Sequence, residues 1–132
     1  MVMKSMLFDT CFLIDIEREM RRGPSGAHAF LSDHRSARAC ITWTVAGEFA
    51  EGFADIHDPA CATMLARFEI LPMNLATAAA YARITAQLRR EKRLIGTNDL
   101  WIAAAALAYD MELVTRNADH FKRVPGIAVT VY

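Results

Sequence analysis

The stretch that decides the fold is Met6-Leu7-Phe8-Asp9-Thr10-Cys11-Phe12-Leu13-Ile14, residues 6–14. Its first three residues are apolar and are followed at once by Asp9, which predicts a short buried strand that ends at an acid. Residues 12–20 then continue as a helix, and Gly23-Pro24-Ser25-Gly26 ends it because glycine and proline favour turns. The chain therefore begins with a strand, an acid and a helix, in that order.

The same alternation of strands and helices continues to the end of the chain. Further strands are predicted at 37–42, 69–72, 112–115 and 127–131. Helices are predicted between them, at 27–33, at 45–56, after Pro59, at 77–93 and from the possible caps Thr97 and Asn98 through Leu107. Strands that alternate with helices indicate an α/β fold with a mostly parallel central sheet flanked by helices. We expect a single domain over residues 1–132, since this length suits one domain.

Composition and charge narrow the class of protein. The chain has 15 basic and 15 acidic residues, and this balance argues against broad, non-specific coating of nucleic acid. The three cysteines, Cys11, Cys40 and Cys61, are widely spaced, which indicates reduced thiols in a cytoplasm and neither a disulfide scaffold nor a zinc site. The apolar N-terminal stretch is too short for a signal peptide, and no stretch approaches the ~20 apolar residues of a membrane helix. We therefore expect a cytoplasmic protein that does not enter a membrane.

Four acidic residues stand out by their positions. Asp9 and Asp119 each follow a predicted strand, Asp99 opens a helix, and Glu48 lies on the helix after the second strand. Open α/β sheets place their chemistry outside the carboxyl ends of the strands. These positions therefore predict an acidic site at that edge, whereas Asp15, Glu17 and Glu19 are interpreted as a solvated helix face.

Glu48 is the most informative of these acids. It lies beside the apolar stripe of its helix, and no Lys or Arg lies within one turn of it. If Asp9, Glu48 and Asp99 converge, charges ~4 Å apart repel by about 4 kcal/mol at an effective dielectric of 20. Protons or a divalent cation must then neutralise them, and oxygen ligands favour Mg²⁺, with Mn²⁺ able to substitute. A bound Mg²⁺ suits hydrolysis of a phosphodiester bond.

Four segments of the chain resemble the motifs of PIN-domain nucleases, in the family's order and over nearly the whole chain. The segments are Leu7-Phe8-Asp9-Thr10 with Leu13-Ile14-Asp15, Thr44-Val45-Ala46-Gly47-Glu48-Phe49 with Gly52, Gly96-Thr97-Asn98-Asp99-Leu100-Trp101-Ile102-Ala103-Ala104, and Leu113-Val114-Thr115-Arg116-Asn117 with His120-Phe121. Each segment is weak alone, but the four together are specific. The short length is most similar to the VapC toxins of bacterial toxin–antitoxin pairs.

That resemblance implies a function. Proteins of this kind are Mg²⁺-dependent endoribonucleases that inhibit growth, often by cutting structured RNA such as tRNA or ribosomal RNA. They usually form homodimers, and a small cognate antitoxin, similar to VapB, blocks the site. The matching motifs imply metal-binding and catalytic roles for Asp9, Glu48 and Asp99.

The chain departs from the family at the fourth acid. Some relatives have Asp where Asn117 stands, and others have an acid where His120 stands. Asp119 is the only carboxylate in this turn, so Asn117 and Asp119 are both candidate catalytic residues and a mechanism with one metal ion stays open. Loss of this acid also motivates an alternative function, a degenerate PIN domain that binds RNA or protein without catalysis.

Structural roles compete with catalytic ones at each acid. Asp9 could cap the helix that follows it, Asp99 could interact with a helix dipole, and Glu48 could pair with a distant arginine. Phosphotransfer on an α/β sheet is a poor alternative, because haloacid-dehalogenase-like phosphatases need a second carboxylate two residues after the first. Cys11 occupies that position here.

Overall fold

The central sheet is built around the first strand. In the computed structural model, which describes residues 4–132, the strands are parallel and are arranged in the order β3-β2-β1-β4-β5. The start of the N-terminal stretch that we interpret as too short for a signal peptide lies outside this range. The strands are β1 (Ser5–Phe8), β2 (Arg38–Thr42), β3 (Glu69–Leu71), β4 (Glu112–Val114) and β5 (Val129–Thr130). The predicted α/β fold with a parallel sheet flanked by helices is confirmed.

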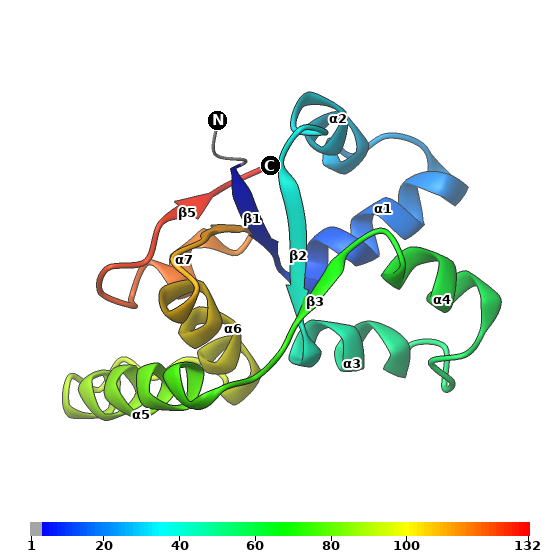
Figure 1. Cartoon of the computed structure of the whole chain (residues 1–132). Coiled ribbons are helices and arrows are strands. Elements are labelled where there is room, and N and C mark those ends of the chain that lie inside the picture. Colours follow the sequence, from blue (N-terminus) through cyan, green and yellow to red (C-terminus); the bar gives the residue numbers. More distant parts are fainter. Residues whose placement is uncertain (1–3) are drawn as a thin grey trace.

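Helices cover both faces of this sheet. They are α1 (Thr10–Arg22), α2 (Ala27–Asp33), α3 (Trp43–Glu51), α4 (Pro59–Leu65), α5 (Leu75–Arg90), α6 (Thr97–Ala108) and α7 (Ala118–Phe121). In Figure 1, α1, α2 and α4 lie to one side of β1 and β2, and α5 and α6 lie to the other, where they pack against each other. Within residues 4–132, no helix combines the length and apolar character needed to cross a bilayer.

Strand register brings distant residues to one edge of the sheet. Phe8 lies opposite Val114 on β4, and Leu7 lies opposite Cys40 on β2. Because paired parallel strands run in the same direction, Asp9 and Thr115 follow the carboxyl ends of adjacent strands. The register therefore sets the position of Asp9 relative to a residue 106 positions away in sequence.

An aromatic cluster fills the space between β1 and the helices α1 and α2. Phe8 lies 4.4 Å from Phe12 and 5.6 Å from Phe68 between ring centroids, and Phe12 lies 6.0 Å from Phe30. Phe8 and Phe12 are almost fully buried. Burial of such side chains contributes about 1.5–3 kcal/mol each, so this cluster anchors α1 directly behind Asp9.

The loop between α1 and α2 is held by Glu19. Its carboxylate accepts hydrogen bonds from the backbone N–H groups of Ser25, Ala27 and His28, and it pairs with the His28 imidazole. Gly23, at φ 96°, allows the turn that leads back to this carboxylate. The Glu19 side chain is only 3% exposed. The prediction of a solvated face is therefore wrong for Glu19, because the loop folds over it.

Two predicted helices end earlier than expected. The helix predicted at 45–56 is α3, which ends at Glu51, and Ala54 then adopts a left-handed φ of 63°. Ile56 is consequently 41% exposed and does not extend the buried stripe of this helix. The helix predicted at 77–93 runs from Leu75 to Arg90, since Lys92 turns the chain with a φ of 57°. Side-chain periodicity did not indicate these backbone turns.

Candidate active site

Asp9 lies directly after β1 and is fixed by neutral donors. One carboxylate oxygen accepts a hydrogen bond of 2.7 Å from the Thr10 N–H, so Asp9 does cap α1. The other oxygen accepts from the Thr115 hydroxyl at 2.8 Å and from the Cys11 thiol at 3.5 Å. Asp9 is only 4% exposed. The capping role and a ligand role are compatible, because a carboxylate oxygen has more than one lone pair.

Glu48 faces the same region from α3. This helix starts where the Thr42 hydroxyl accepts a hydrogen bond from the Val45 N–H at 3.1 Å. One Glu48 oxygen accepts from the Thr10 hydroxyl at 2.7 Å, and the other accepts from the Asn98 amide at 3.3 Å. No Lys or Arg of residues 4–132 forms an ion pair with Glu48. The distant arginine considered as an alternative partner is therefore not found.

Asp99 completes the acidic group from the first turn of α6. Burial raises the pKa of Asp99, and the charges of Asp9 and Glu48 raise it further. His120 opposes this shift, since its Nδ1 atom lies 3.8 Å from an Asp99 oxygen. The pKa of Asp99 is thus raised by the charges of both other carboxylates. The structure therefore brings the three predicted acids, Asp9, Glu48 and Asp99, into one group.

Electrostatic strain is present at Asp9 as well. Burial raises the pKa of Asp9, hydrogen bonds from Thr115, Thr10 and Cys11 lower it, and the Glu48 charge raises it again, so that the result is a raised pKa. Such mutual repulsion is relieved by a proton or by a cation. The donors are carboxylate oxygens, which suit a hard divalent ion.

These side chains form an open set of possible ligands. Within the described part of the chain, no three carboxylate, imidazole or thiol groups are gathered tightly enough to enclose an ion as they stand. The hydrogen bonds from Thr10 and Asn98 occupy the oxygens of Glu48. Asp9, Glu48 and Asp99 nevertheless supply three carboxylate groups, none of them paired with a Lys or Arg of residues 4–132, and this donor chemistry fits Mg²⁺.

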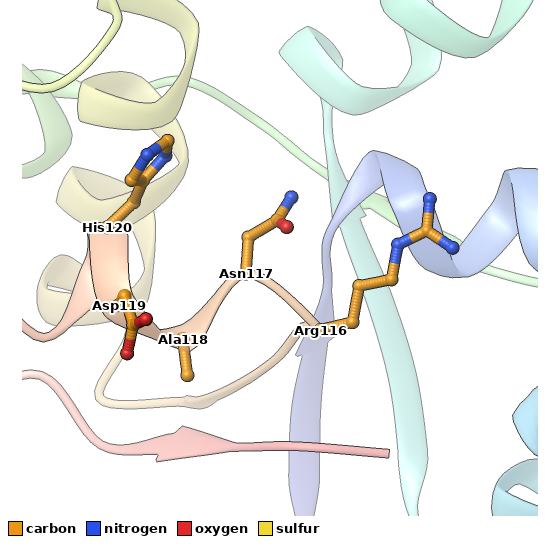
Figure 2. A pocket seen from close by; sticks show the side chains of 5 residues that line it. All are labelled: Arg116, Asn117, Ala118, Asp119 and His120. Carbon is orange, nitrogen blue, oxygen red and sulfur yellow. The ribbon is translucent and has the colours of Figure 1, made fainter.

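The loop after β4 lines a cavity next to the acidic group, since one of its lining residues, His120, lies 3.8 Å from Asp99. The cavity measures about 250 Å³ and is lined by residues 116–120. Figure 2 shows the side chains of Asn117 and His120 on one side of this loop and that of Asp119 on the other. Asp119 is exposed, whereas the Asn117 N–H is fixed by the Thr115 hydroxyl at 3.0 Å. The same Thr115 hydroxyl donates to Asp9, so it connects the Asn117 backbone to the acidic group, whereas no hydrogen bond or ion pair among the described residues connects Asp119 to that group.

A second buried acid, Asp15, binds Arg116 of the loop after β4. Both oxygens of Asp15 accept hydrogen bonds from Arg116, at 2.7 and 2.8 Å, and one also accepts from the Tyr132 hydroxyl at 2.6 Å. Asp15 is 5% exposed, so the prediction of a solvated position is wrong for this residue too. The residue lies between Ile14 and Ile16, and a lone acid in such an apolar run could have indicated a buried partner.

Other residues that hold the acidic side chains in place were not predicted from the sequence. Thr10 and Thr115 follow the ends of β1 and β4 much as Asp9 does, but a rule restricted to acids does not include their hydroxyl groups. Applied to hydroxyl residues, the same rule would have found both. Nothing in the sequence marks Asn98 as a partner of Glu48, because the contact joins the first turn of α6 to a residue in the second half of α3, 50 positions away.

Together these features define an α/β protein with an acidic centre at the carboxyl edge of a parallel sheet, of the kind that can hold a divalent ion. The sequence profile of the PIN domain matches residues 6–127. The chain belongs to the PIN-domain family.

Several known proteins are similar to this chain. Ribonuclease VapC of Rickettsia bellii is 40% identical over 62 residues, which are 47% of this chain and 46% of the relative, so the match spans about half of each protein. Ribonuclease VapC1 of Methanocaldococcus jannaschii is 27% identical over 96% of this chain and 86% of its own length.

A solved structure supports the same fold. The structure of VapBC2 from Rickettsia felis bound to a promoter DNA fragment contains a chain that matches with a TM-score of 0.82. The match covers 97% of this chain and 98% of that one at 22% identity. This likeness extends the PIN-like fold over nearly all of the chain.

Proposed function

We propose that this protein is a metal-dependent endoribonuclease that hydrolyses phosphodiester bonds of RNA. The observation that supports it is the meeting of Asp9, Glu48 and Asp99 from three separate elements, with no Lys or Arg of the described residues paired to them. Relatives named ribonuclease VapC add to this support.

The three carboxylates would hold Mg²⁺, for which Mn²⁺ could substitute. A bound ion would supply activation of water and stabilisation of the charge on the leaving oxygen. The protein supplies the arrangement of the ligands. Thr115 and the Thr10 N–H fix Asp9, and the Thr10 hydroxyl fixes Glu48 relative to it, so one residue connects two acids.

The loop after β4 would contact the substrate. The Asn117 side chain is exposed at the cavity beside the acids, where its amide can donate to a phosphate oxygen. Arg116 is held by Asp15 through one guanidinium nitrogen, and its side chain is half exposed, so it retains donors that can face an RNA strand. Neither residue replaces the missing fourth carboxylate, and we therefore favour a mechanism with one metal ion.

The relatives supply the basis for a proposed biological role. We propose that the chain is a growth-inhibiting toxin, that it acts on structured RNA such as tRNA or ribosomal RNA, and that an antitoxin similar to VapB neutralises it. We also propose that it forms a homodimer. Structural neighbours that are VapBC complexes motivate the antitoxin partner.

Cleavage of structured RNA tests the activity. Wild-type protein and Asp9→Asn are incubated with tRNA and ribosomal RNA, with Mg²⁺ or with a chelator, after circular dichroism has shown that both are folded. An Asn at position 9 can still accept from the Thr10 N–H, so the fold should persist while a ligand charge is lost. We expect cleavage by wild type with Mg²⁺ only, and at least a hundredfold slower cleavage by the variant.

Asp110→Asn is the matched control for this experiment. Asp110 is an exposed acid at the end of α6, before the amino end of β4, so it lies away from the acidic centre. Its substitution should leave cleavage unchanged. Folded wild type that neither cuts RNA nor binds a divalent ion would contradict the proposal and would favour the degenerate binding domain.

A further inference from the structure

A second cavity lies at the opposite edge of the sheet. It measures about 570 Å³, and its charged or aromatic lining residues are His28, His34, Arg35, Arg67 and Phe68. It lies between α2, the start of β2 and the turn from α4 to β3. β2 alone spans about 16 Å at 3.3 Å per residue, so this basic cavity is separated from the acidic centre by the length of a strand.

The two imidazoles of the basic cavity are held in fixed orientations. Nδ1 of His34 lies 2.8 Å from the Phe30 carbonyl oxygen, and its ring stacks on Phe30 with centroids 4.0 Å apart. Nδ1 of His28 binds the Glu19 carboxylate. Since a carbonyl or carboxylate only accepts, each Nδ1 carries the proton. Each Nε2 atom has no hydrogen-bond partner in the part of the chain that the structure describes, and on protonation it becomes a donor.

The two guanidinium groups of the basic cavity lack acidic partners. Among residues 4–132, neither Arg35 nor Arg67 forms an ion pair, whereas nearby Arg38 is bound through two nitrogens to Glu69. Glu19, the acid that faces His28, already accepts from the α1–α2 loop. Two arginines and two histidines therefore surround one space, and no carboxylate of the described residues lines it.

We propose that the basic cavity is a binding site for a phosphate group. A phosphate group offers several acceptor oxygens and at least one negative charge, one in a phosphodiester and up to two in a phosphomonoester, and its oxygens match two guanidinium forks and two Nε2–H donors better than a single carboxylate does. The cavity volume is in the range of small-molecule sites, and Leu31 and Phe68 give it an apolar wall. The group belongs either to a small phosphorylated molecule or to the backbone of an RNA.

Binding of inorganic pyrophosphate tests this site without using cleavage as the readout. Full-length protein is titrated at mildly acidic pH without divalent ions, by calorimetry and by amide chemical shifts. We expect saturable binding, with the largest shifts at residues 28–35 and 67–68. The double variant Arg35→Ala/Arg67→Ala should bind at least tenfold more weakly.

The control variant removes two positive charges, as the test variant does, but at a site away from the basic cavity. Arg89 and Arg90 are exposed at the end of α5, and Arg89→Ala/Arg90→Ala should bind pyrophosphate as wild type does. Absence of saturable binding, or an equal loss in both double variants, would overturn the proposal. These outcomes do not depend on whether the protein is a nuclease.

A single-stranded RNA of ten nucleotides distinguishes the two sources of the phosphate. If the RNA competes with pyrophosphate and loses affinity in Arg35→Ala/Arg67→Ala, the site binds RNA backbone. If pyrophosphate binds but the affinity for RNA is the same in both proteins, the site binds a small phosphorylated molecule. Either result supports a phosphate site.

Discussion

Substitution of Asp15 by Asn should destabilise the protein strongly although the two side chains have the same shape. Asp15 is almost fully buried, and all three of its side-chain hydrogen bonds come from Arg116 and Tyr132. Burial and Asp15 itself raise the pKa of Tyr132, so this phenol remains a donor at any working pH. An Asn would direct an NH₂ group at one of these donors.

The expected loss follows from the number and kind of bonds. Hydrogen bonds that involve a charged group contribute about 1.5–3 kcal/mol each, and breaking a buried pair costs about 3–5 kcal/mol. Arg116 is 46% exposed and can turn to water, which reduces the loss. We therefore expect about 3 kcal/mol, which corresponds to a fall in Tm of roughly 10 °C for a chain of this size.

Urea and thermal unfolding of wild type and Asp15→Asn measure this loss, and Asp33→Asn on the exposed end of α2 is the control. A double-mutant cycle with Tyr132→Phe isolates the contact between the two side chains, and we expect a coupling of about 1 kcal/mol. A loss below about 0.5 kcal/mol for Asp15→Asn, equal to that of the control, would refute the reasoning.

Two further predictions concern residues near α1. Although burial alone would raise it, hydrogen bonds from Ser25 and His28 lower the pKa of Glu19 to about 2. The folded pKa lies below the ordinary value of 4.5, so Glu19 stabilises the protein above about pH 4.5 and this stabilisation is lost as the pH falls toward 2. Plots of urea midpoint against pH should therefore be flatter for Glu19→Gln than for wild type over that range, and parallel plots would contradict the assignment. Thr115→Val keeps the shape of the side chain but removes the hydroxyl that donates to Asp9. The free energy of unfolding should fall by about 1–3 kcal/mol, and the affinity for Mn²⁺ measured by titration should be weaker. If both values were unchanged, the hydroxyl would not hold this carboxylate.

Strand and helix order was predictable because each element carries a local pattern. The apolar run before Asp9 and the alternation that follows it indicated a parallel sheet, and this prediction is confirmed. Helix ends were less predictable. Ala54 and Lys92 adopt left-handed backbone angles, which are more typical of glycine, so neither residue type signals the turn.

The acidic group was predictable, but its support was not. Asp9 stood out at a strand end and Asp99 at a helix start, whereas Glu48 stood out because it lies beside an apolar stripe with no Lys or Arg within one turn. The contacts from Thr115 to Asp9 and from Tyr132 to Asp15 join residues 106 and 117 positions apart, and such pairs depend on the register of the folded sheet. A pattern read along the chain does not contain that register.

The central position of β1 has a consequence for synthesis on the ribosome. β1 is made first, yet one of its neighbours, β4, is made about a hundred residues later, as the 106 positions between Asp9 and Thr115 indicate. At 5–20 residues per second, roughly 5–20 s separate the two. A nascent chain can pair β1 with β2 during that time, but the edge that carries Asp9 remains incomplete. The acidic centre is therefore a late product of translation, and it does not form on a chain that stops before β4.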